Sequence, residues 1–164
     1  MDNLLGIIKS MNEYGEDAPG KKSIQKMIYL IQEAGIPLGY DYNIHFYGPY
    51  SAELDLDLRY LTGSGSLDMN ITKTKHEFTV VEDNISSPSP EIQTIINQYI
   101  AKTPSDLELL ATTLYVQRAL QDVNLDNIVS GVTKIKGSKY SVNQISHAFG
   151  ELSKSGYFHS QNTQ

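Results

Sequence analysis

The chain has 164 residues, which is enough for one domain with a substantial core or for two small lobes. It contains no cysteine, so disulfide bonds and thiolate chemistry are excluded. Residues up to Pro90 carry 7 Lys and Arg against 13 Asp and Glu, and this acidic half argues against a protein that coats nucleic acid without specificity. The sequence shows no membrane-length apolar run and no signal-peptide pattern, which predicts a cytoplasmic protein without a membrane partner.

Two helices are predicted at the start of the chain. Apolar residues recur every three or four positions over residues 4–11 and again over 24–31, which is the spacing of one helix face. Gly35 and Pro37 end the second helix, because Gly adopts the left-handed conformation readily and Pro cannot continue the hydrogen-bond ladder. The start of this helix is basic.

A short strand and a third helix follow. Alternation over residues 42–47 predicts a half-buried strand, which Gly48-Pro49 breaks. Ser51 is a helix cap, and the third helix places Leu54, Leu58 and Leu61 on one face. We expect Gly48 to adopt a conformation that is costly for other residues.

A β-hairpin with a basic tip comes next, since residues 67–71 and 78–80 alternate in polarity on either side of Lys-Thr-Lys-His. The segment 83–90 is rich in Ser and Pro and marks a boundary. The order helix, helix, strand, helix, hairpin predicts a winged-helix-like lobe over residues 1–85, with the hairpin as the wing.

Further helices are predicted after this boundary. They begin at Ser89-Pro90, at Thr103-Pro104, near Leu125 and at Ser141, where Gln144 completes a capping box. The whole pattern therefore predicts an α+β fold, with a helical lobe over 91–158 and a disordered tail over 159–164. No helix of the second lobe reads as apolar on all sides, so we expect that lobe to pack on the first or on a second subunit of a homodimer.

Three segments carry a resemblance to a known family, and these are KKSIQKMIYLIQEAGIP, HFYGPYS and AELDLDLRYL. With them the chain resembles the uncharacterised bacterial YwgA-type proteins over nearly its whole length. More distantly, it is similar to the SocA/Panacea antitoxin-like domain, in which a Lys-Leu-x-Tyr-type helix precedes a Tyr-Gly-Pro corner. The corresponding residues here are Lys26-Met27-Ile28-Tyr29 and Tyr47-Gly48-Pro49. The resemblance implies a winged-helix-like regulator or an antitoxin-type binding protein.

No group of residues is typical of catalysis or of metal binding. Asp55 and Asp57 are two positions apart, so they leave a helix in different directions and cannot clamp one ion. The four histidines lie in unlike elements and form no HExxH pattern. Ser51 lacks the glycines of a nucleophile elbow. We therefore expect no catalytic residue, no metal and no cofactor.

A candidate nucleic-acid interface is formed by basic or protonatable side chains at the start of the second helix and at the hairpin tip. These residues are Lys21, Lys22, Lys26, Lys73, Lys75 and His76. In a winged helix the two groups can contact duplex DNA phosphates from two sides, and the ordinary alternative is a solvated surface. This arrangement favours, narrowly, a DNA-binding transcriptional regulator.

A protein partner is the alternative. The residues that would contact it belong to the tyrosine corner and to the acidic third helix, and they are Tyr47, Tyr50, Glu53, Asp55 and Asp57. Three carboxylates are unfavourable beside phosphates, so this helix favours a protein-interaction module of the antitoxin or adaptor type. A second basic run, Lys134, Lys136 and Lys139, also suits an acidic partner.

Overall fold

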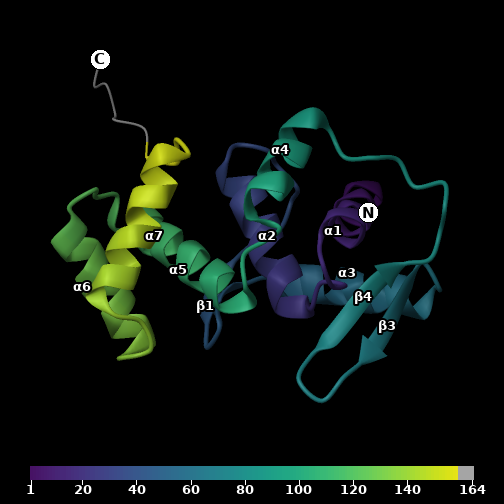
Figure 1. Cartoon of the computed structure of the whole chain (residues 1–164), viewed down its shortest axis with the longest axis horizontal. Helices are drawn as coiled ribbons and strands as arrows, with labels where there is room; N and C mark the ends of the chain where they lie inside the picture. Colours follow the sequence, from purple (N-terminus) through teal and green to yellow (C-terminus); the bar gives the residue numbers. More distant parts are fainter. Residues whose placement is uncertain (159–164) are drawn as a thin grey trace.

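The computed structural model describes residues 1–158, and the tail predicted over 159–164 lies outside them. The described part contains seven helices and two antiparallel hairpins, so the α+β prediction is confirmed (Figure 1). The elements are α1 (Asp2–Tyr14), α2 (Lys21–Glu33), β1 (Asn43–His45), β2 (Gly48–Tyr50), α3 (Ala52–Gly63), β3 (Leu67–Ile71), β4 (His76–Val80), α4 (Pro90–Tyr99), α5 (Pro104–Leu120), α6 (Leu125–Lys136) and α7 (Val142–Lys154).

Helix ends lie where local chemistry places them. The Ser51 hydroxyl accepts a hydrogen bond from the Leu54 amide at the start of α3. Ser141 and Gln144 form the predicted capping box at the start of α7. Beyond α2, Gly35 has a φ of +97°, which other residues rarely adopt. The side chains of Ser51, Ser141 and Gln144 satisfy terminal backbone groups that have no partner within their own helix.

The segment between α2 and α3 differs from the predicted single strand. Gly48 and Pro49 do not end a strand but form β2, which pairs back on β1 with Ile44 opposite Pro49. Phe46 and Tyr47 form the turn, and Phe46 is 84% exposed rather than half-buried. A hairpin of three-residue strands has edges on both sides and therefore tolerates a proline. Gly48 has a φ of +90°, as expected for a glycine-dependent corner.

The β3–β4 hairpin, predicted as a wing, lies against α1 and the start of α2. The Phe78 amide donates to the Pro19 carbonyl oxygen at 2.9 Å. The Asn12 side chain bridges to β4 by donating to the Phe78 carbonyl at 2.9 Å and accepting from the Val80 amide at 3.0 Å. Phe78 itself is buried in the core. The base of the hairpin is thus fixed, while its tip carries the basic turn.

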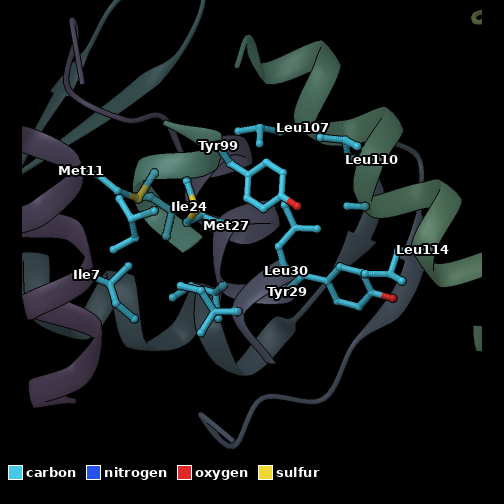
Figure 2. Close-up of a cluster of buried hydrophobic side chains, with 14 of the residues drawn as sticks. Ile7, Met11, Ile24, Met27, Tyr29, Leu30, Tyr99, Leu107, Leu110 and Leu114 are labelled. Carbon is cyan, nitrogen blue, oxygen red and sulfur yellow. The ribbon is translucent and has the colours of Figure 1, made fainter. Parts of the chain in front are cut away.

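Helix α5 is the central element of the core. Every residue from Leu107 to Leu114 is buried, including the polar side chains of Glu108, Thr112 and Thr113. This burial arises because α2, β2, α6 and α7 all pack on α5. Figure 2 shows the junction, where Leu107, Leu110 and Leu114 of α5 face side chains of α2 and the buried Tyr99 of α4.

Buried side chains from both predicted lobes form one hydrophobic cluster. Helix α4, the first element after the Ser/Pro-rich boundary, packs on α1 and α2 and so joins the two parts. The division near residue 85 stays an interpretation of composition. Among residues 1–158, no helix is both long enough and apolar enough to cross a membrane.

Candidate nucleic-acid interface

The Tyr-Gly-Pro corner is fastened to the buried side of α2. The Lys26 ammonium donates to the Pro49 carbonyl oxygen at 2.7 Å. Gln25 binds Ser51 twice, donating to its carbonyl at 2.8 Å and accepting from its amide at 2.9 Å. A Cβ on Gly48 would lie 2.7 Å from the Thr112 hydroxyl of α5, so only glycine fits there. The corner is therefore held between α2 and α5.

A buried carboxylate, that of Glu108 on α5, lies beside this corner with a side chain that is 0% exposed. Three ammonium groups surround it, with Lys22 at 3.0 Å, Lys136 at 3.2 Å and Lys139 at 2.6 Å. The Tyr140 hydroxyl also donates to Glu108. One negative charge thus gathers three positive charges from α2, α6 and the α6–α7 turn, and a local excess of positive charge remains.

The pKa values of the cluster reflect this arrangement. Burial by itself raises the pKa of Glu108, but hydrogen bonds from Lys139, Tyr140 and Lys22 lower it to about 2. Burial lowers the pKa of Lys26 to about 7, because Glu108 offsets only part of the cost of enclosing its charge. The carboxylate is therefore ionised at neutral pH, whereas Lys26 is close to its titration midpoint.

Exposed aromatic rings adjoin these lysines. The Lys22 ammonium lies 4.9 Å and the Lys139 ammonium 5.9 Å from the centroid of the Tyr47 ring, so two cations contact one aromatic ring. Phe46 stacks edge-on against Tyr47 at 5.0 Å, and its carbonyl accepts a 2.6 Å hydrogen bond from Lys136. Both rings are more than half exposed. We call Lys22, Lys136, Lys139, Phe46 and Tyr47 the lysine–aromatic patch.

The two predicted basic groups come together only in part. Lys75 at the hairpin lies beside Gly20, the residue that precedes α2, and is paired with Glu77 at 3.1 Å. Lys73 and His76 are exposed at the tip. Lys26 was predicted to contact a phosphate and is buried instead, because α2 is enclosed on this side by β2 and α5. Lys26 is therefore not available to a phosphate.

One acid of the face predicted for α3, Asp55, is neutralised by cations. Asp55 is buried between Lys21 at 2.6 Å and Arg59 at 3.0 Å, so it is neither solvated nor open to a partner. Asp57 accepts a 2.7 Å hydrogen bond from the Tyr40 hydroxyl. Glu53 is exposed, and Tyr50 is half-buried. The objection that three carboxylates would face phosphates therefore no longer applies to Asp55, but it still applies to Glu53 and Asp57.

Glu108 and Tyr140 are functional candidates that the sequence analysis missed. Glu108 lies in the segment Leu107–Leu114, and a charged residue inside such an apolar run is a signal of a buried pair. Its partners are too far along the chain to be identified by spacing. Among residues 1–158, no three His, Asp or Glu side chains are placed to hold a metal ion.

A comparison with known protein families finds no family model that matches the chain. The chain is 30% identical over 122 residues to the uncharacterized protein YwgA of Bacillus subtilis (strain 168). The matched region covers 66% of this chain and 71% of YwgA. The name of that protein assigns it no activity, so this similarity bears on family and not on function.

Proposed function

The chain belongs to the YwgA family, and we propose that it is a non-enzymatic protein that binds duplex DNA as a winged-helix regulator does. The observation that carries the proposal is the lysine–aromatic patch. Three lysines share the single carboxylate of Glu108, in a chain whose net charge is −6, and two of them, Lys22 and Lys139, keep 28% and 40% of their side chains exposed, whereas Lys136 keeps 4%. Such a local positive excess on an acidic protein favours one defined phosphate contact over nonspecific coating.

The start of α2 links this patch to the wing. Lys21 and Lys22 are consecutive, Lys22 belongs to the patch, and Lys75 lies beside Gly20. A row of lysines thus runs from the hairpin across the start of α2 to Lys139, and within it Lys75 is paired with Glu77 and Lys21 with Asp55. Lysines along such a row can follow a phosphate backbone, while the exposed Lys73 extends it at the tip.

A salt series tests the proposal. Affinity for random duplex DNA, measured by fluorescence anisotropy, should fall steeply as salt rises. Lys139→Gln and Lys73→Gln should each reduce the logarithmic salt slope by about one, since each removes about one phosphate contact. Lys154→Gln, at the far end of α7, removes the same charge outside the row of lysines and should leave the slope unchanged.

The absence of binding at low salt would contradict the proposal. Tighter binding of single-stranded DNA of equal length would also contradict the duplex assignment, because unpaired bases stack on exposed rings such as those of Phe46 and Tyr47. The distant resemblance to the SocA/Panacea domain supports a regulator of the antitoxin type.

A protein-interaction module is the second candidate, and one observation favours it. Leu56 and Tyr60 lie one turn apart on α3 and are 63% and 62% exposed, which is unusual for large apolar side chains on a helix. Leu56→Lys together with Tyr60→Lys should abolish self-association or partner capture if this face is a contact. Sedimentation analysis of the purified chain and a pull-down would measure this effect.

A further inference from the structure

The turn of the β1–β2 hairpin carries the most exposed large apolar side chain among residues 1–158. This residue is Phe46, which is 84% exposed, and the neighbouring Tyr47 is 56% exposed. Figure 1 shows β1 beside α5, with the turn of the hairpin projecting away from that helix. A phenyl ring that lies almost wholly in water contributes nothing to the core, so only a partner outside the chain can cover it.

The backbone of this turn is fixed on both sides. Strands β1 and β2 pair antiparallel on either side of it. The Lys136 ammonium donates to the Phe46 carbonyl oxygen at 2.6 Å, and the Lys26 ammonium holds the Pro49 carbonyl oxygen of β2 at 2.7 Å. Little conformational freedom would therefore be lost when the Phe46 ring contacts a partner, because its backbone is already ordered.

The two rings of the turn have different surroundings. The Lys22 and Lys139 ammonium groups lie 4.9 Å and 5.9 Å from the centroid of the Tyr47 ring. The Phe46 ring meets Tyr47 edge-on, at an interplanar angle of 87° and a centroid distance of 5.0 Å. The turn thus places an uncharged, projecting ring next to two lysines that keep 28% and 40% of their side chains exposed.

Duplex DNA offers a surface for each of these features, since its phosphates attract the lysines and its base-pair steps can admit a ring. In proteins that kink DNA, an apolar side chain enters between two base pairs from the minor groove and partly unstacks them. We propose that Phe46 is such a wedge and that the protein kinks the duplex where it binds. This inference rests on the proposed duplex binding and adds to it the way in which the DNA is deformed.

A wedge gives a preference among DNA sequences without any hydrogen bond to a base. Pyrimidine–purine steps such as TA unstack most easily, so insertion of Phe46 costs least at such a step. Phosphate contacts from Lys22 and Lys139 are the same for every sequence. A duplex with one central TA step should therefore bind at least about threefold more tightly than the same duplex with an AA step in that place.

Energy transfer between dyes at the two ends of the duplex tests the proposal with the full chain. Binding should raise the transfer efficiency by the amount expected for a kink of at least about 20°, and 2-aminopurine at the central step should brighten as it unstacks. Salt-dependent binding with neither change would overturn the wedge and leave the proposed duplex binding intact. No binding to the duplex at low salt would overturn both.

Variants identify the ring. Phe46→Ala should abolish the kink and weaken affinity for the TA duplex by about three- to tenfold, yet keep the salt slope, because Lys22 and Lys139 remain. Phe46→Leu keeps an apolar wedge and should retain the kink. Val123→Ala truncates another exposed apolar side chain, in the turn after the far end of α5, and should change nothing.

A kink that survives Phe46→Ala would overturn the assignment of the wedge. The high exposure of Phe46 means that its variants remove no core contact, so their effect on the DNA reports the ring and not the stability of the fold. Loss of affinity for single-stranded DNA alone, with the duplex kink unchanged, would show that the ring stacks on unpaired bases and would also overturn the proposal.

Discussion

The Lys26 ammonium of α2 and the Pro49 carbonyl of β2 form a buried hydrogen bond of 2.7 Å. This bond places a titratable group against a backbone acceptor in the interior, beside the positive charges that surround Glu108. It joins the second helix to the Tyr-Gly-Pro corner, and it makes the stability of the corner sensitive to the protonation state of one lysine.

Lys26 should make unfolding depend on pH in the alkaline range. Its pKa is about 7 in the folded chain against an ordinary value of 10.5, so the unfolded chain binds more protons between these values and stability rises with pH there. Urea denaturation should show the wild type gaining about 1–3 kcal/mol relative to Lys26→Met between pH 7 and pH 9. Lys154→Met, at an exposed site, controls for general alkaline effects, and parallel profiles for the wild type and Lys26→Met would contradict this assignment.

Glu108→Gln should be strongly destabilising. The substitution leaves three ammonium groups without their shared carboxylate, and removing one partner of a buried ion pair costs about 3–5 kcal/mol. Urea midpoints at neutral pH measure the loss. Glu13→Gln makes the same change at an exposed residue of α1 and should alter stability by less than about 0.5 kcal/mol.

Low pH should destabilise the protein as Glu108→Gln does. The folded-state pKa of Glu108 is about 2 against an ordinary 4.5, so its stabilising contribution is present above pH 4.5 and is lost as pH falls through about 2. The stability gap between the wild type and Glu108→Gln should therefore narrow between pH 5 and pH 2. A gap that stays constant over this range would show that Glu108 does not titrate differently in the two states.

Gly48→Ala separates backbone strain from steric overlap when it is compared with Gly65→Ala. The two glycines have similar φ values, +90° and +85°. A new Cβ at position 48 meets the Thr112 hydroxyl at 2.7 Å, whereas at position 65 it meets nothing within 4 Å. Gly65→Ala should lose about 1 kcal/mol, and Gly48→Ala should lose about 1–3 kcal/mol more. Equal shifts in thermal midpoint would show that the corner accommodates the new Cβ without any additional loss of stability.

Asp55→Asn should destabilise the junction between α2 and α3. Asp55 is buried between Lys21 and Arg59, so loss of its charge leaves two cations without their shared partner. We expect a loss of about 1–3 kcal/mol in chemical denaturation. Asp68→Asn, on the exposed face of β3, is the matched control. If both variants unfold at the same denaturant concentration as the wild type, the ion pairs of Asp55 contribute nothing to stability.

Elements that depend on neighbours in sequence could be predicted from the sequence. The caps at Ser51 and Ser141, the Gly35 terminator and the β3–β4 hairpin all follow from local backbone chemistry. The β1–β2 hairpin could not be predicted in the same way, because Gly48-Pro49 is typical of a break. Its pairing depends on packing against α5, which is distant in sequence.

The candidate site was harder to predict, for a related reason. Lys22 and Lys26 are one helical turn apart, and nothing local distinguishes the half-exposed residue from the buried one. Burial of Lys26 depends on Pro49 and α5, and the position of Lys22 depends on Glu108. Charge patterns therefore mark basic segments in the sequence, whereas the environment of each lysine depends on contacts between distant parts of the chain.

The central position of α5 has a consequence for how the chain is made. The helix that covers α2 and the Tyr-Gly-Pro corner starts at Pro104, after more than half of the chain has been synthesised. Until α5 leaves the ribosome, α2 lacks one of the helices that cover it, and the corner lacks the helix against which it packs. Contacts of such long sequence separation slow folding, so the apolar face of α2 that packs on α5 stays exposed in the nascent chain until α5 is available.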